Sequence, residues 1–106
     1  MIVVTSEVIA NKRIVRTLGL VRGNTVRARH IGKDIMAGLR NIVGGEVHEY
    51  AKLIAESREQ SIDRMVAEAA SLGANAIIAT RFTTSVMMGG AAELLAVGTA
   101  VIVEDE

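Results

Sequence analysis

The longest periodic pattern of hydrophobic and polar positions in this chain runs from Glu46 to Leu72. Hydrophobic residues recur three and four positions apart, with charged residues between them, which is typical of an amphipathic helix. Glu46 and Glu49 fall in the first turn, where the helix dipole favours negative charge, and Gly73 follows as a stop. The predicted buried face comprises Val47, Tyr50, Ala51, Ile54, Ser57, Arg58, Ile62, Met65, Val66, Ala69 and Leu72.

The length of this predicted helix has a consequence for assembly. At 1.5 Å per residue it is about 40 Å long, whereas the strands of a small domain usually span about 20 Å. The helix would therefore extend beyond the sheet of its own domain. We expect the overhanging part to contact a second subunit.

Two strand patterns follow the helix, Asn75–Val86 and Glu93–Val103. The short glycine-containing connection Met87–Ala92 joins them, so we expect an antiparallel hairpin. Because side chains alternate along a strand, one face of the first strand should carry Ala76, Ile78, Thr80 and Phe82. The matching face of the second should carry Leu94, Ala96, Gly98, Ala100 and Ile102.

The first part of the chain has weaker patterns. Residues 2–4 form a candidate short strand, and Arg13–Leu20 with Asn24–Arg29 predict either two strands or one strand bent at a bulge. Ile31–Val43 has helical spacing, and Gly44-Gly45 would then turn the chain into the long helix. We predict a single α+β domain over residues 1–106, with an antiparallel sheet packed by one long and one short helix.

The composition adds one argument about assembly, which comes from the amount of aliphatic surface. Half of the residues are hydrophobic and only 2% are aromatic, with a mean hydropathy of +0.36. A single small core cannot easily bury that much aliphatic surface, and monomers rarely expose large apolar patches. A subunit interface is the expected place for the excess.

The cellular location is predicted from three features. The chain contains no cysteine and no apolar run of about 18 residues. Its N-terminal residues also lack the order of a secretory signal peptide, because the basic residues follow the apolar ones. We therefore expect a cytoplasmic protein with neither a disulfide nor a transmembrane helix.

The charges are balanced overall but unevenly distributed. Residues 1–40 carry eight Lys or Arg against two acidic residues, and residues 41–106 carry four against ten. The first half could form an anion or nucleic-acid patch, or the two halves could pair their charges within or between subunits. The lack of aromatic residues for base stacking and the zero net charge favour charge pairing over nucleic-acid binding.

Several short motifs resemble those of one known family. They are the run from Arg29 to Asp34, the run Ala37–Glu46 (AGLRNIVGGE) with Tyr50 after it, the run Ala70–Ile77 (ASLGANAI) and the run Gly98–Val101 (GTAV). In this order and spacing, they resemble the YbjQ-like family of small bacterial and archaeal proteins. The resemblance implies a dodecin-like protomer, a homopentameric ring and a heavy-metal-binding label. Val97 departs from the pattern, because family members often carry an aromatic residue just before the last motif.

A metal site would need ligands other than cysteine. The candidates are His48, His30 and Glu46, with the thioethers of Met87 and Met88 as further donors for a divalent or heavy metal ion. The two histidines are eighteen residues apart, which is not the spacing of a local metal motif. A ring could still bring one histidine from each copy together near its symmetry axis. The alternative is that each histidine is only solvated or hydrogen-bonded.

Two further site classes have weaker support. An anion could bind Gly44 and Gly45 at the start of the long helix, with Lys33 and Arg40 nearby, although these glycines could equally serve only as a turn. No nucleophile, base and orienting group fall at a recognisable spacing, so we expect no enzymatic activity. The leading interpretation is a ring that binds a metal or small ligand; the alternative is an oligomeric scaffold without a dedicated ligand.

Overall fold

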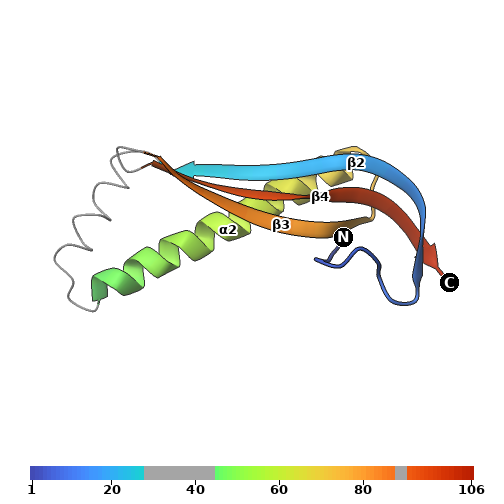
Figure 1. Cartoon of the computed structure of the whole chain (residues 1–106), viewed down its shortest axis with the longest axis horizontal. Helices are drawn as coiled ribbons and strands as arrows, with labels where there is room; N and C mark the ends of the chain where they lie inside the picture. Colours follow the sequence, from blue (N-terminus) through green and yellow to red (C-terminus); the bar gives the residue numbers. More distant parts are fainter. Residues whose placement is uncertain (28–44, 88–90) are drawn as a thin grey trace.

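Four strands and one helix make up the described part of the chain (Figure 1). The computed structural model describes residues 1–27, 45–87 and 91–106, with the backbone alone at residues 27, 45–51, 53, 86–87 and 91–92. The elements are β1 (Ile2–Val3), β2 (Lys12–Arg27), α2 (Gly45–Ser71), β3 (Ala76–Met87) and β4 (Ala91–Asp105). The predicted α+β class is confirmed. The predicted short helix over residues 31–43 lies outside the described residues.

The strands form one sheet in the order β1-β3-β4-β2. β3 and β4 pair antiparallel from Met87 opposite Ala91 to Ala76 opposite Val101, which confirms the predicted hairpin. β2 also pairs antiparallel with β4, but β1 pairs parallel with β3. The sheet is therefore antiparallel across its three long strands and mixed as a whole, because the chain start adds beside β3 in the same direction.

β2 is one continuous strand with two irregularities, not two strands. Its register against β4 shifts between Ile14 and Arg16 and again between Thr17 and Gly19. Gly19 has a φ of 124°, a backbone conformation that side chains other than hydrogen rarely allow. The interpretation of one strand bent at a bulge is therefore the correct one for the described residues.

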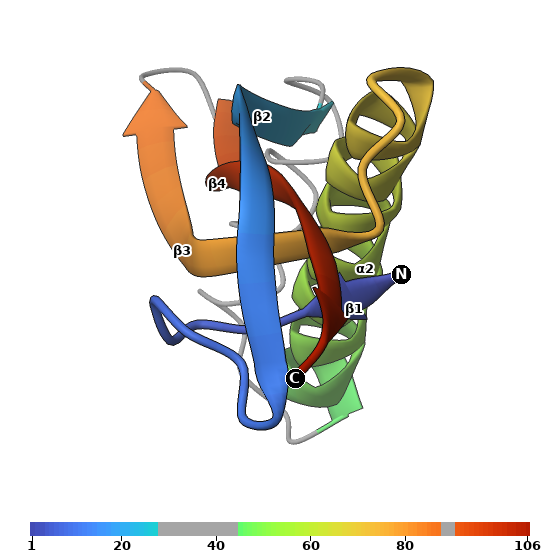
Figure 2. The ribbon, with the colours of Figure 1, turned by 90° about the vertical axis from the view of Figure 1, so that its right-hand side faces the viewer.

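β3 contains a bulge that the sequence did not predict. Its register against β4 shifts between Ile78 and Arg81, and Ala79 has a left-handed φ of 54°. The extra residue reverses the alternation of side chains, and the accompanying bend in β3 is visible in Figure 2. The prediction of one shared face for this strand was therefore wrong: Ala76 and Ile78 lie on the face opposite to that of Phe82.

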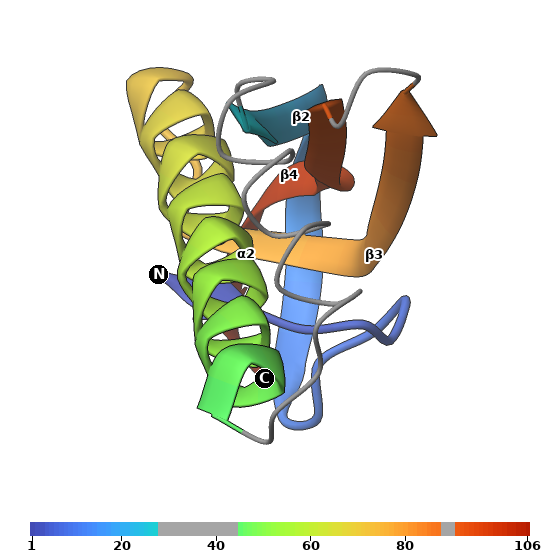
Figure 3. The same cartoon turned by 90° about the vertical axis from the view of Figure 1, so that its left-hand side faces the viewer.

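Helix α2 covers one face of the sheet, mainly over β2 and β4 (Figures 2 and 3). Among its described side chains, the fully buried ones are Ser57, Ser61, Met65 and Ala69, which follow one another at intervals of four residues. Arg58 is exposed, and Leu72 just beyond the helix is 47% exposed. Ser57, Met65 and Ala69 of the predicted face are therefore confirmed as buried. The prediction was wrong in omitting Ser61 and in including Arg58 and Leu72.

The serines face the sheet because the helix approaches β2 very closely. A Cβ atom at Gly23 would lie 2.2 Å from the Ser61 carbonyl oxygen and 2.4 Å from the Met65 backbone nitrogen. Next to this contact, Thr25 Oγ1 donates to the Ser57 carbonyl at 3.2 Å and lies 3.2 Å from Ser61 Oγ. The Ser61 hydroxyl also lies 3.1 Å from the carbonyl oxygen of Leu94 in β4. Small residues and buried hydroxyls thus fill the space where the helix is nearest to the sheet.

The core is divided between the two faces of the sheet. On the helix side, Met65 and Ala69 pack with the buried strand residues Val21, Ile77, Ala96 and Ala100. On the opposite face, Ala76, Val101 and Val103 are covered by Ile2 and Ile9 of the N-terminal segment. Among the described residues, that cover lies at the end of the sheet where both chain termini are found (Figure 1).

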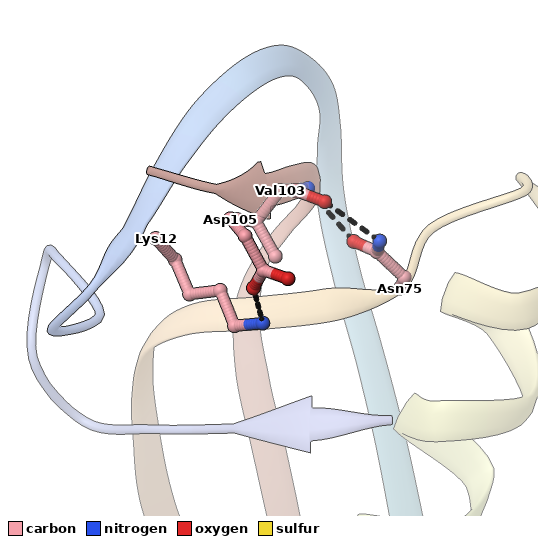
Figure 4. Close-up of polar contacts among 4 residues, drawn as sticks. All are labelled: Lys12, Asn75, Val103 and Asp105. Carbon is pink, nitrogen blue, oxygen red and sulfur yellow. Dashed lines mark hydrogen bonds and ion pairs between the residues drawn. The ribbon is translucent and has the colours of Figure 1, made fainter.

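Side-chain contacts fix this terminal end of the sheet (Figure 4). The Asn75 side-chain amide donates to the Val103 carbonyl at 2.9 Å and accepts from the Val103 N–H at 2.8 Å. The amide therefore acts like one more residue of β3 paired with β4. Lys12 and Asp105 form an ion pair across the ends of β2 and β4, also drawn in Figure 4.

Candidate assembly interface

An apolar strip runs along the face of the sheet that α2 does not cover. Leu20 and Val26 of β2 are 63% and 58% exposed, and Leu95 and Val97 of β4 are half-buried. The four residues share a face because Val21, Gly23 and Thr25, which alternate with the β2 pair, face the helix. In the described part of the chain, nothing covers this apolar strip. On β2, Arg22 and Asn24 lie between Leu20 and Val26 on this face, opposite Val97 and Leu95. Exposed aliphatic side chains on an uncovered sheet face are typical of a protein–protein contact.

Polar and charged groups flank the two β4 residues of the apolar strip, Leu95 and Val97. The strand register places Arg22 and Arg81 on either side of Val97. The Arg81 guanidinium donates to the carbonyl oxygens of Thr5 at 2.7 Å and Thr80 at 2.8 Å. An apolar centre with a polar rim is the usual composition of a subunit interface.

The edge of β3 is covered over only part of its length. The N-terminal segment contributes a ladder of backbone hydrogen bonds along it, from Ile2 N–H to Asn75 O at 3.2 Å up to Ala79 N–H to Ser6 O at 2.8 Å. The bulge directs two successive N–H groups to this segment, since Thr80 N–H also donates, to Val4 O at 3.1 Å. Beyond Thr80, no described strand pairs with the outer edge of β3.

The molecule is elongated rather than compact. Its Cα radius of gyration is 17.0 Å and its principal extents are 55 × 23 × 16 Å. A compact domain of this length has a radius of gyration of about 13 Å. The excess reflects a long narrow sheet with a long helix, and Figure 1 shows α2 diverging from the sheet toward its N-terminal end.

The predicted metal ligands are only partly placed. Glu46 and His48 lie in the first turn of α2, where the backbone alone is described, and His30 lies outside the described residues. Within the described part of the chain, no group of three or more His, Cys, Asp and Glu residues could hold a metal ion. The metal hypothesis therefore stays a prediction about the helix start and about neighbouring copies.

The predicted anion site is likewise untested. Gly45 is the first residue of α2, while Lys33, Arg40 and Gly44 lie outside the described residues. Further along the helix, Lys52, Ala55, Glu56, Glu59 and Gln60 line an open surface depression. Its two carboxylates and single ammonium group do not make it an anion site.

Ion pairs between the two halves of the chain account for part of the uneven charge distribution. Lys12 pairs with Asp105, and Arg13 Nη2 lies 3.1 Å from Glu104 Oε2. The hydrogen bond and charge of Lys12 lower the pKa of the exposed Asp105 carboxyl. Both pairs join basic residues of the first half to acidic residues of the second, as the charge-pairing interpretation predicts.

The apolar strip could not be recognised from the sequence. Its residues are ordinary strand positions, and Leu20 and Val26 alternate with Val21 and Thr25, so both faces of β2 carry apolar side chains. That alternation was the available signal. The sequence alone could not show which of the two faces the helix covers.

Comparisons with known proteins place this small α+β protein, with its helix-covered mixed sheet, in a family. The YbjQ_1 family model, described as "Putative heavy-metal-binding", matches residues 1–104. The chain therefore belongs to the YbjQ family, which confirms the resemblance seen in its motifs. The description carries no enzymatic name, and among the described residues no helix is long and apolar enough to cross a membrane.

Its relatives come from archaea and bacteria. A UPF0145 protein of Methanosarcina acetivorans is 55% identical over 101 residues, covering 95% of each chain. One of Dehalococcoides mccartyi is 58% identical over 104 residues, covering 98% of this chain and all of that protein. A crystal structure of a DUF74-family protein of unknown function from Pediococcus pentosaceus has a TM-score of 0.65 at 14% identity, covering 98% of each chain. At that identity the likeness supports the fold alone.

Proposed function

We propose that this protein is a non-catalytic ring, most simply a homopentamer, that binds a metal ion or another small ligand. The main support for assembly is the uncovered apolar strip, in which Leu20 and Val26 are more than half exposed on an elongated protomer. Burying such a surface contributes about 25 cal/mol for each Å² of apolar area removed from water. A closed ring would cover the apolar strip on every copy.

The ligand part of the proposal rests on the position of His48. It lies in the first turn of α2, the end that diverges from the sheet. One imidazole from each copy, arranged around a symmetry axis, would supply several nitrogen ligands to a borderline metal ion such as Zn²⁺. The family description is in line with this chemistry. A ligand site built across copies also does not require three ligands within one described protomer.

Native mass spectrometry of the untagged protein tests both parts together. The expected result is a pentamer that carries extra mass, and that mass is lost when the sample is denatured with a chelator. His48→Ala should remove the bound mass and leave the stoichiometry unchanged. A monomer would refute the ring, whereas a pentamer whose bound metal survives His48→Ala would refute the assigned ligand.

A scaffold without a dedicated ligand is the second candidate. It is favoured by the lack of any three-residue metal-binding group in the described part of the chain. It predicts a pentamer with no bound mass under the same conditions. Leu20→Lys should weaken assembly in either case, because it places a charge in the apolar strip.

A further inference from the structure

The outer edge of β2 is closed by two side chains of α2. The backbone N–H of Arg22 donates to Glu68 Oε2 at 3.4 Å, and the Arg64 guanidinium donates to the carbonyl oxygen of Asn24 at 2.5 Å. Arg22 and Asn24 are two residues apart, so their backbone polar groups point to the same side of the strand. β4 pairs with the other side of β2. The two contacts therefore occupy hydrogen-bonding positions that a further strand would need.

The spacing of the helix matches the spacing of the strand at this point. Four residues of an α-helix rise about 6 Å, and two residues of a strand span about 7 Å. Arg64 and Glu68 can therefore each reach one of two successive outward-facing residues. Gly23 lies between those two residues, and its missing side chain lets the helix backbone pass directly over the strand.

Without these contacts, β2 would be an open template for strand addition. It is 16 residues long and is an edge strand of the sheet. The exposed Leu20 and Val26 flank the closed part. Long apolar edges of this kind lead to edge-to-edge pairing and aggregation unless charged groups or covering elements block them.

We propose that Arg64 and Glu68 form an edge guard, which stops a second copy of this chain from adding a strand at the centre of β2. A partner strand would have to displace both charged side chains before its own backbone could pair. The edge guard leaves the face of the sheet accessible, so contacts through the apolar strip remain possible while sheet extension is blocked. The edge guard blocks strand addition whether or not the copies form a ring.

The test is a double variant, Arg64→Ala with Glu68→Ala, compared with the unaltered protein over a hundredfold range of concentration. Sedimentation velocity should show concentration-dependent species heavier than the unaltered assembly, whatever the stoichiometry of that assembly. The matched control is Arg58→Ala with Glu59→Ala, two exposed residues on the same helix. Both variants remove one positive and one negative charge, so they differ only in the closure of the edge.

Hydrogen exchange at the Arg22 amide gives a second measurement. At low concentration this amide should exchange about fivefold faster in the double variant, as expected for the loss of one hydrogen bond worth about 1 kcal/mol. At high concentration its protection should rise above that in the unaltered protein, because an added strand would pair with it. Simple unfolding would instead speed exchange throughout the core.

The outcomes separate clearly. Heavier species in the double variant alone, with protection at Arg22 that increases with concentration, would support the edge guard. Unchanged mass distributions in both variants would overturn it. Equal aggregation of both variants, or aggregation with faster exchange in every core strand, would overturn it as well, because destabilisation rather than edge pairing would then be the cause.

Discussion

β2 and β3 flank the same strand, β4, and both depart from regular pairing, yet different parts of the chain compensate for the two departures. The irregular stretch of β2 leads into the region covered by α2, where Gly23 and Thr25 meet the helix backbone and its serines. The bulge of β3 lies beyond most of the helix and is held by the N-terminal segment through backbone hydrogen bonds.

The two strands also differ in whether their buried threonine hydroxyl has a hydrogen-bond partner. Thr25, 3% exposed, has partners in Ser57 and Ser61. Thr80, equally buried, carries the only buried side-chain oxygen or nitrogen in the described part of the chain without a hydrogen-bond partner. A helix close to a strand supplies Thr25 with side-chain and carbonyl partners. The N-terminal segment instead accepts hydrogen bonds from the backbone of Ala79 and Thr80 and from the Arg81 side chain, and not from the Thr80 hydroxyl.

The largest expected effect comes from breaking the close approach at β2. Gly23→Ala should lower the free energy of unfolding by about 3 kcal/mol, since the new methyl group would overlap two helix backbone atoms that cannot move independently. The measurement is urea unfolding at fixed protein concentration. Gly19→Ala is the control: nothing lies within 4 Å of a Cβ there, so only the positive φ opposes it, at roughly 2 kcal/mol. Equal losses for the two variants would contradict the steric explanation.

The two buried threonines test the comparison most directly. Thr25→Val should destabilise the protein by about 1 kcal/mol, because it removes a hydrogen bond to Ser57 O and leaves Ser61 with fewer partners. Thr80→Val should stabilise it by about 1 kcal/mol, because it removes an unpaired buried hydroxyl at nearly constant volume. Thermal unfolding of both variants at one protein concentration measures the signs. If both variants lost stability, Thr80 would have a partner.

The smallest effect is expected at the exposed ends of β2 and β4. Lys12 lowers the pKa of Asp105 in the folded state, so their pairing is present at neutral pH and is lost as the pH falls through that lowered pKa. Lys12→Met should raise the Asp105 pKa toward its ordinary value in an NMR titration. Its effect on stability at neutral pH should be close to the measurement error, because exposed ion pairs contribute little. An unchanged Asp105 pKa would show that the pair does not form in solution.

The long helix and the hairpin could be predicted from the sequence because their signals are local. Periodicity of three and four residues defines Gly45–Ser71 to within one residue at each end. Alternation and the glycine-containing connection define β3 to within one residue at each end and β4 to within two. The Ala70–Ile77 and Gly98–Val101 motifs identified the family. An oligomer, inferred from the excess of aliphatic residues, remains a prediction, as do the metal and anion sites.

Contacts between distant parts of the chain could not be predicted from the sequence. The bulge at Ala79 has no glycine, proline or asparagine to mark it in the sequence. It is stabilised instead by backbone hydrogen bonds to Val4 and Ser6, which are far away along the chain. Ser61, which the predicted face omitted, is buried where Gly23 lets the helix backbone come very close to β2. Arg64 and Glu68 look like ordinary surface charges until the fold brings them to the edge of β2. Local patterns determine which elements form, whereas the distance between elements determines what each side chain does.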